Sequence, residues 1–351
     1  MPEKIGMYGG SFDPLHTGHV QCIEKASGMC DRLYVVLSHC RVRDHYPVEI
    51  RYRWLMQTVG RMKNVQVILL EDAAPTKEAY DRGAYWEEGR DRILSRIGAP
   101  VDVVFCGSDY HGTNRYETLY GCEVICFDRG QTAISSSAIR ENPLRHWDML
   151  PEAVRPYFVR RIALVGGEST GKSTLTRMLA AAYGTNCLEE VGRSVCDYAG
   201  TEDSMIAEDF HEILLAHKAG EIALARQSRR LLFVDTEAVT TLWYSGFLLT
   251  SEEEKERIRA LAEAIIRINR FDLVLFLEPT VPFVQDGTRN ERIAADRLRF
   301  SEQIKSLLRF YGVEFICLDG DYSERFERAK QLIRDRFGVE EEPAQPVQAG
   351  E

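Results

Sequence analysis

The chain has 351 residues, of which 44% are hydrophobic and 28% are charged. This composition is typical of a globular protein, and the length favours two domains because one core rarely organises more than ~250–300 residues. The formal net charge of −10 argues against a non-specific nucleic-acid binder, which would be basic.

The sequence carries no signal for export or membrane insertion. No apolar run approaches the ~20 residues that a membrane span needs, and no secretory leader precedes the first motif. The nine cysteines show neither a CxxC pair nor zinc-binding spacing, which is typical of reduced thiols. We therefore expect a cytoplasmic protein that binds neither membranes nor nucleic acid. The sequence leaves homo-oligomerisation open.

Short runs rich in Val, Ile and Leu recur along the chain, separated by segments of helix length. They are residues 5–8, 33–37, 65–70, 101–106 and 124–127 in the first half, and 162–165, 187–189, 231–234, 273–277 and 314–318 in the second. This pattern is typical of parallel strands that are buried on both faces and joined by helices. It predicts two open, parallel-sheet α/β domains, residues 1–145 and 161–339.

Prolines at positions 143, 151 and 156 interrupt helical continuation between the two halves. Aromatic residues in the same segment indicate a partly packed connector, residues 146–160. The tail, residues 340–351, carries four acids and no base together with two prolines, which predicts a disordered end.

Each half opens with a strand, a glycine turn and a helix start, a combination that favours phosphate binding. The first opening, residues 9–19, reads GGSFDPLHTGH. His16 and His19 are three residues apart and share one face of a helix start, from which two imidazoles can donate to the α-phosphate of a nucleotide. The neighbouring backbone would approach the phosphates at Gly9, Gly10, Ser11, Phe12 and Gly18.

A second element, ISSSAIR, follows the last strand of the first half. Ser135, Ser136 and Ser137 offer hydroxyls and amides at a helix start, and Arg140 adds a permanent charge. A plain helix cap with a solvated arginine is the structural alternative.

Three weaker candidates could bind the acceptor in this half: Arg51, Trp86 and Asp109. Arg51 could bind an acceptor phosphate, and Trp86 could stack on a planar ring. Asp109 follows a strand end and could bind the nucleotide. Core packing for Trp86 and a structural turn at Asp109 are the alternatives.

The second opening reads GGESTGKS and matches the P-loop pattern G-x-x-x-x-G-K-[ST] between an apolar strand and a helix. Lys172 would reach the β- and γ-oxygens of a nucleotide, and Ser173 would ligate Mg²⁺. The backbone cradle comprises Gly166, Gly167, Glu168, Ser169, Thr170, Gly171, Ser173 and Thr174.

Four further residues of the second half follow strand ends or crowd a turn. Asp235 ends an apolar run and suits a Walker-B carboxylate for Mg²⁺. Glu190 could orient or deprotonate an acceptor hydroxyl, and Arg193 could clamp it. Arg289 lies beside an Asp-Gly turn and could close over ATP. The structural alternatives are a capping role for Asp235, a surface ion pair for Glu190 and Arg193, and a solvated helix face for Arg289.

GGSFDPLHTGH and ISSSAIR resemble the motifs of the HxGH adenylyltransferases. A connector and GGESTGKST follow them, an order that resembles the bifunctional NadR family, in which a nicotinamide-nucleotide adenylyltransferase is fused to a ribosylnicotinamide kinase. EEVGR, FVDTEAVTT and VQDGTR are similar to that kinase. The resemblance implies a Rossmann-like HxGH nucleotidyltransferase fold followed by a P-loop kinase fold.

The resemblance also implies two reactions with ATP as co-substrate. The second domain would phosphorylate nicotinamide riboside to NMN, with Glu190 as base or hydroxyl orienter and with Asp235 and Ser173 around Mg²⁺. The first domain would join NMN to the α-phosphate of ATP, releasing pyrophosphate and giving NAD. His16, His19 and Arg140 would align and neutralise the phosphates there, and Lys172 would act in the second site.

The string GGSFDP departs from the GKFxP-like string expected of the family and is similar to adenylyltransferases that act on nicotinate mononucleotide or phosphopantetheine. An alternative is therefore the same chemistry on nicotinate mononucleotide or another nucleoside, and a second alternative is a nucleotide sensor with weak turnover. The first strand begins near Lys4, so we expect no helix-turn-helix segment and no DNA binding.

Overall fold

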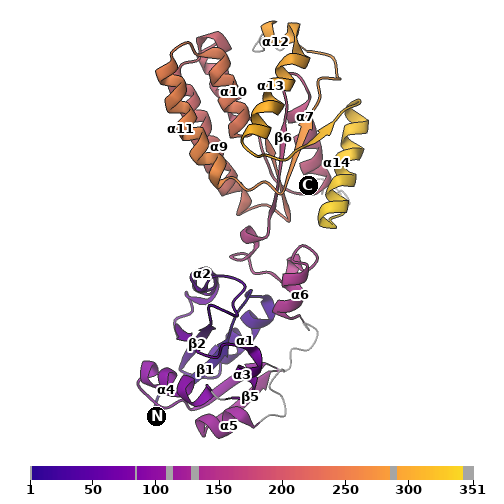
Figure 1. The fold of residues 1–351 in the computed structure, drawn as a ribbon. Coiled ribbons are helices and arrows are strands. Elements are labelled where there is room, and N and C mark those ends of the chain that lie inside the picture. The colour runs from indigo at the N-terminus through magenta and orange to yellow at the C-terminus, as the bar shows by residue number, and fades with distance from the viewer. Residues whose placement is uncertain (1, 84, 108–113, 128–133, 285–290, 343–351) are drawn as a thin grey trace, which may run out of the picture. The chain divides into compact units, whose positions relative to one another are not determined.

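The computed structural model describes residues 2–83, 85–107, 114–127, 134–284 and 291–342 (Figure 1). The chain divides into two compact units, Met1–Tyr157 and Phe158–Glu351. Trp147 and Leu150, within the expected connector, are buried as parts of the first unit.

The first unit contains a five-stranded parallel sheet. Its strands are β1 (Ile5–Gly10), β2 (Arg32–His39), β3 (Val65–Glu71), β4 (Val103–Gly107) and β5 (Glu123–Phe127). They are ordered β3-β2-β1-β4-β5. The chain order reverses beside β1, and ligands of open α/β sheets bind at the carboxyl ends of the strands at such a point.

Helices cover both faces of this sheet. They are α1 (Thr17–Ser27), α2 (Val48–Val59), α3 (Lys77–Asp81), α4 (Trp86–Ile97), α5 (Arg115–Tyr120) and α6 (Ser136–Glu141), with 3₁₀ turns at Trp147–Met149 and Arg155–Tyr157. Ile93 of α4 packs with Met7, Val36 and Val104 on one face of the sheet. Residues 33–37 of β2 are all buried, so the alternating side chains of this interior strand bury apolar groups on both faces.

The second unit contains another five-stranded parallel sheet, with β6 (Arg160–Val165) at its centre. The other strands are β7 (Cys187–Leu188), β8 (Leu231–Asp235), β9 (Leu273–Leu277) and β10 (Ile316–Leu318), and the order is β10-β9-β6-β8-β7. Every residue of β8 and β9 is buried, as continuous apolar runs predict for central parallel strands. The prediction of two parallel α/β domains is confirmed.

The helices of the second unit are α7 (Lys172–Ala182), α8 (Val191–Ala199), α9 (Ala207–Ala225), α10 (Ala238–Leu248), α11 (Glu252–Ile268), α12 (Glu291–Ala295), α13 (Arg297–Phe310) and α14 (Tyr322–Phe337), with a 3₁₀ turn at Glu202–Ser204. Val239 of α10 and Ile304 of α13 pack on one face of the sheet. Helices α7 and α14 contact each other (Figure 1).

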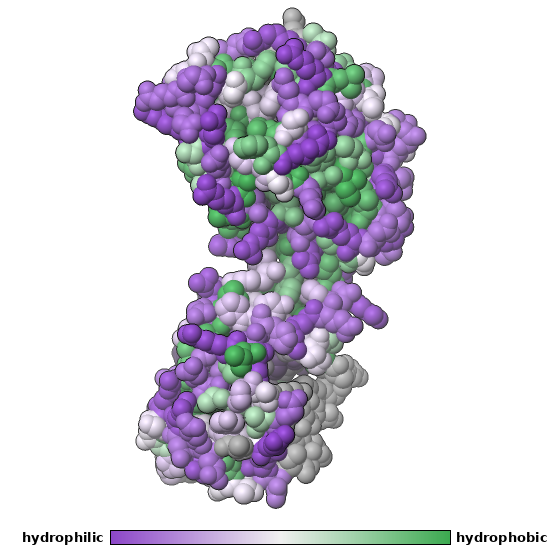
Figure 2. All heavy atoms as spheres, in the orientation of Figure 1, coloured by the Kyte–Doolittle hydropathy of each residue, from purple (hydrophilic) through white to green (hydrophobic). Residues whose placement is uncertain are grey.

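Polar side chains cover much of the face of each unit that Figure 2 shows, with apolar groups between them. Among the described residues, no helix is both long enough and apolar enough to span a membrane. Within the tail, Glu340 pairs with Arg334 and Glu341 pairs with Lys330. Residues 343–351 lie outside the described part of the chain.

Candidate active sites

The two histidines of the first motif lie together at the start of α1. His16 is the N-cap residue, and its carbonyl accepts the backbone N–H groups of His19 (2.9 Å) and Val20 (3.2 Å). The two imidazole rings stack with centroids 3.6 Å apart. Both line a pocket with Gly9 and Gly10. Helix geometry thus brings both histidines to the carboxyl end of β1.

Phe12 lies behind this pair and does not line the pocket with its side chain. Its ring is fully buried and meets the His19 ring edge-on, with centroids 5.0 Å apart. A Cβ on Gly10 would lie 3.1 Å from the Phe12 ring, so the glycine permits this packing. The expected contact between the Phe12 segment and phosphate can come only from its backbone. Gly18 is buried in the first turn of α1.

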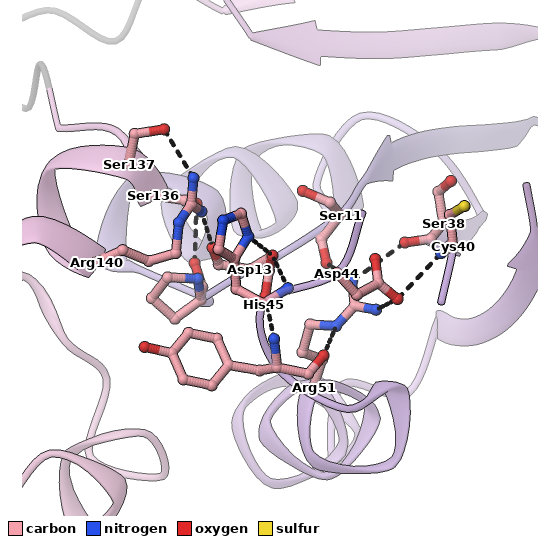
Figure 3. Close-up of polar contacts among 12 residues, drawn as sticks. Ser11, Asp13, Ser38, Cys40, Asp44, His45, Arg51, Ser136, Ser137 and Arg140 are labelled. Atoms are coloured by element: carbon pink, nitrogen blue, oxygen red, sulfur yellow. Dashed lines mark hydrogen bonds and ion pairs between the residues drawn. The ribbon is translucent and has the colours of Figure 1, made fainter. Parts of the chain in front are cut away.

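The start of α6 forms another wall of the same pocket, which Ser135, Ser136, Ser137 and Arg140 all line. Ser135 caps α6 by accepting the N–H of Ala138, and Ser136 donates to the carbonyl of Pro14 at 3.0 Å. Figure 3 shows Arg140 between Ser137, whose hydroxyl it reaches at 2.9 Å, and the carbonyl of Asp13. The two motifs of this half therefore share one site.

Arg51 is not part of that site, which corrects the expectation that it binds an acceptor. Its side chain is fully buried and donates to the carbonyls of Tyr46 (3.0 Å) and Ser11 (2.7 Å) and to the carboxylate of Asp44 (Figure 3). A buried guanidinium must satisfy its donors within the protein. Arg51 therefore holds loops beneath the pocket.

Trp86 lines the pocket. Its indole N–H donates to the carbonyl of Tyr80 at 2.9 Å, and the guanidinium of Arg115 lies 4.5 Å from its ring centroid. The structure also brings Arg43 and Arg90 to the pocket wall. Sequence reasoning missed both because no motif links these separate segments. Asp109 lies outside the described residues.

The P-loop of the second unit connects β6 to α7. Gly166 has φ 151° and Gly171 has φ 88°, conformations that favour glycine. A Cβ would also lie 2.7 Å from the carbonyl of Leu277 at the first position and 2.7 Å from the ring of Tyr322 at the second. Turns of this kind present successive backbone N–H groups to an anion. The glycine turn therefore leads directly into the N-terminus of α7, and the expected phosphate cradle stays a prediction.

Several P-loop side chains make contacts within the loop. The Lys172 ammonium donates to the carbonyl of Gly167 at 3.1 Å, and the Thr170 hydroxyl donates to the same carbonyl at 2.9 Å. Glu168 and Ser169 line a pocket with Lys172. Thr174 is exposed on α7.

Asp235 ends β8 and is fully buried. Burial, and next the charge of Glu190, raise the pKa of Asp235 to about 6. Lys172, the hydroxyl of Ser173 and Arg193 act in the opposite direction. Residues of two other segments, the P-loop and the stretch after β7, therefore lie within electrostatic reach of this carboxylate. Its Oδ2 atom has no hydrogen-bond partner among the described residues.

A pocket extends from Lys172 past Glu190 and Arg193. Its further wall contains residues that the sequence did not single out: Phe210, Ile213, His217, Thr241, Tyr244 and Leu248. His217 lies with Nε2 3.1 Å from the carbonyl oxygen of Asp235, and burial lowers the pKa of this imidazole. These residues occupy α9 and α10, where an apolar helix face reads as ordinary core.

Arg289 lies outside the described residues, so its expected role over ATP stays a prediction. Two other arginines of that segment are described. Arg292 pairs with Asp203 at 3.3 Å, and Arg297 donates to the P-loop carbonyl of Ser169 at 3.0 Å.

Family models match both units. A model described as cytidylyltransferase-like matches residues 7–142, and one described as an AAA domain matches residues 161–325. The first of these contains the histidine motif and the serines of α6, and the second contains the P-loop and Asp235.

Two similar proteins align with nearly the whole chain, and a third aligns with less than half of it. The "Trifunctional NAD biosynthesis/regulator protein NadR" of Escherichia coli K12 is 32% identical over 96% of this chain and 84% of its own length, and that of Salmonella typhimurium is 31% identical over the same shares. A phosphopantetheine adenylyltransferase of Streptococcus pneumoniae is 38% identical, over 40% of this chain and 84% of its own.

Solved structures agree on the fold. A NadR protein in complex with NR superimposes with a TM-score of 0.81 at 24% identity, covering 98% of this chain and 99% of that one. A NadR protein in complex with NAD and AMP-PNP has the same score and identity, with coverages of 97% and 98%.

Proposed function

Because this chain belongs to the NadR family, we propose that it phosphorylates nicotinamide riboside to NMN in its second unit and converts NMN to NAD in its first. The chain is an enzyme with nucleotidyltransferase and kinase activities. The observation that carries the proposal is that each unit has a helix starting at a motif that suits phosphate binding: α1, capped by His16, and α7, capped by Gly171. We assign the two sites to residues 1–145 and 161–339, respectively.

In the first site, a phosphate oxygen of NMN attacks the α-phosphorus of ATP, and pyrophosphate leaves. The NMN phosphate is already ionised at neutral pH, so the attack needs no protein base. His16, His19 and Arg140 align the phosphates and neutralise the charge that develops on them. The amides and hydroxyls of Ser135, Ser136 and Ser137 would hold the β- and γ-phosphates.

The acceptor of this site would lie toward Trp86, whose aromatic surface suits a nicotinamide ring. Arg43 and Arg90 would favour the negative charge of NMN. Asp109 stays a proposed nucleotide contact. The NadR protein solved with NAD and AMP-PNP supports this choice of ligands.

In the second site, the 5′-hydroxyl of nicotinamide riboside attacks the γ-phosphorus of ATP, giving NMN and ADP. Glu190 would orient or deprotonate that hydroxyl, and Arg193 would hold the riboside. Lys172 and the P-loop amides would bind the β- and γ-phosphates, and Arg289 would neutralise the transferring group. The NadR protein solved with NR supports this acceptor.

Asp235 and Ser173 fit a magnesium ion bound with ATP. The buried Oδ2 of Asp235 lacks a hydrogen-bond partner in the described part of the chain, and Ser173 lies against the same carboxylate. Mg²⁺ accepts one or two protein oxygens together with substrate phosphates, so the absence of a cluster of three or more His, Cys, Asp or Glu among the described residues does not conflict with this. When bound, the ion neutralises phosphate charge.

The experiment that tests the proposal offers the protein Mg·ATP with one acceptor at a time. Nicotinamide riboside, NMN, nicotinate mononucleotide and phosphopantetheine would each be incubated, and the products identified by mass spectrometry. We expect NMN with ADP from the riboside, and NAD with pyrophosphate from NMN. Turnover of nicotinate mononucleotide or phosphopantetheine with none of NMN would refute the proposed acceptor while preserving the reaction type.

We also propose that the chain works in the cytoplasm without binding nucleic acid. The net charge of −10 supports the absence of nucleic-acid binding, and a gel-shift assay with duplex DNA tests that absence. Light scattering of the purified chain tests whether it forms homo-oligomers.

A further inference from the structure

A buried arginine of α14 binds the P-loop from outside the nucleotide cradle. Arg325 is 1% exposed. Its Nη1 donates to the carbonyl of Thr170 at 2.6 Å, and its Nη2 donates at 2.6 Å to the carbonyl of Glu278 and to the hydroxyl of Thr280. One planar guanidinium therefore ties the P-loop to the segment that follows β9.

A second arginine binds the preceding peptide group of the P-loop. Arg297 opens α13, and its Nη2 donates to the carbonyl of Ser169 at 3.0 Å. Its Nη1 donates to the carbonyl of Val281 at 2.7 Å. Two guanidinium groups, from two helices, thus hold two successive P-loop carbonyls and anchor both to residues 278–281.

The direction of these bonds fixes the direction of the P-loop amides. A peptide group is planar, and in the trans form its N–H points opposite to its C=O. A bond to the carbonyl of Thr170 therefore turns the N–H of Gly171 away from Arg325, and a bond to the carbonyl of Ser169 does the same for the N–H of Thr170. The left-handed φ of 55° at Ser169 and of 88° at Gly171 is typical of loops whose successive N–H groups bind one anion.

We propose that Arg325 and Arg297 are positioning residues of the kinase site, which aim the Gly171 and Thr170 amides at the β- and γ-phosphates of ATP. This inference rests on the proposed ATP site of the second unit. The positively charged guanidinium bonded to each carbonyl also polarises the peptide group, which strengthens its N–H as a hydrogen-bond donor. Core packing alone would explain the burial of Arg325, but it does not require two arginines on consecutive P-loop carbonyls.

The test compares nucleotide binding of the full chain with that of Arg325→Lys, which keeps the charge and loses the planar fork. The first unit also binds ATP, so calorimetry of Lys172→Ala defines which part of the binding belongs to the P-loop. We expect Arg325→Lys to weaken this Lys172-dependent binding of ATP and ADP about tenfold, the effect of losing one charge-assisted hydrogen bond. Binding of AMP should change much less, because AMP lacks the β- and γ-phosphates.

The matched control is Ile333→Ala, which removes a fully buried side chain from the same helix. We expect a lower melting temperature and unchanged Lys172-dependent ATP affinity in the folded protein. An equal loss of ATP affinity in Ile333→Ala, or an equal loss for AMP and ATP in Arg325→Lys, would overturn the inference and assign Arg325 to helix stability.

A second variant covers the case in which Arg325→Lys fails to fold. Arg297 is only partly buried. Arg297→Gln should likewise weaken the binding of ATP and ADP more than the binding of AMP. Unchanged ATP binding in this variant would overturn the inference. A wild-type chain that binds ATP through Lys172 and phosphorylates no riboside would refute the proposed function and leave this inference standing, because the calorimetric measurement needs no acceptor.

Discussion

The imidazole rings of His16 and His19 lie stacked, with centroids 3.6 Å apart and planes 25° from parallel. His16 caps the helix that carries His19, and the backbone N–H of His16 lies 3.4 Å from Nδ1 of His19. Two imidazoles so close together can contact neighbouring oxygens of one phosphate chain. His16 is 1% exposed, and the His19 ring meets the buried Phe12 ring, so their roles in adenylyl transfer must be measured on variants shown to be folded.

We expect His19→Ala to lower the rate of NAD formation from NMN by about 10²–10³-fold, as for the loss of one preorganised donor to a reacting phosphate or acyl group. Phosphorylation of nicotinamide riboside by the same preparation should continue at the wild-type rate. Chromatographic separation of NMN, NAD and ADP measures both reactions together. Loss of both in a folded variant would contradict the assignment of two sites.

Lys172→Ala should give the reverse pattern. Lys172 is 7% exposed, and its ammonium lies against the carbonyl of Gly167, within reach of the loop that would hold the phosphates. We expect riboside phosphorylation to fall below detection, while NAD formation from supplied NMN persists. A lysine needed only for the fold would instead lower the melting temperature of the second unit and leave residual kinase activity in the folded fraction.

The fold could be predicted from the sequence because each central strand carries an unbroken apolar run. Residues 231–234 and 273–277 were predicted strands and correspond to β8 and β9. Some strand ends were less accurate: residues 101–106 were predicted and β4 spans Val103–Gly107, and residues 314–318 were predicted and β10 spans only Ile316–Leu318. An apolar run indicates a strand, but it does not by itself mark the residue at which pairing with the neighbouring strand begins.

The local motifs of the candidate sites were also visible, since a glycine turn before a helix carries its own backbone chemistry. Side chains that converge from distant segments were not. Arg325 follows Thr170 by more than half the kinase unit in sequence, and no pattern in the chain indicates that it binds the P-loop. The prediction that Arg51 binds an acceptor was wrong, because the sequence does not reveal whether a single arginine is exposed or buried.

Asp235→Asn should separate stability from activity. Burial and the Glu190 charge raise the pKa of Asp235 to about 6, so without Mg²⁺ the ionised carboxylate destabilises the folded unit above that pH. We expect the variant to lose kinase activity and to melt at a higher temperature than wild type in EDTA. The difference in melting temperature should be small below the ordinary pKa of 3.8, where both states bind the proton, and should grow from there up to about pH 6. A difference that shrinks as the pH rises would contradict this account.

Arg51→Met should destabilise the first unit without a specific effect on the acceptor. The guanidinium is fully buried and bonded to Asp44 and to the carbonyls of Tyr46 and Ser11, and removing one partner of such a buried pair costs about 3–5 kcal/mol. Chemical unfolding followed by circular dichroism measures this loss, and the KM for NMN of the folded fraction should stay at the wild-type value. Arg53→Met is the matched control, because Arg53 is exposed on the same helix and its loss should leave stability nearly unchanged. A raised KM for NMN with normal stability in Arg51→Met would show that Arg51 binds the acceptor after all.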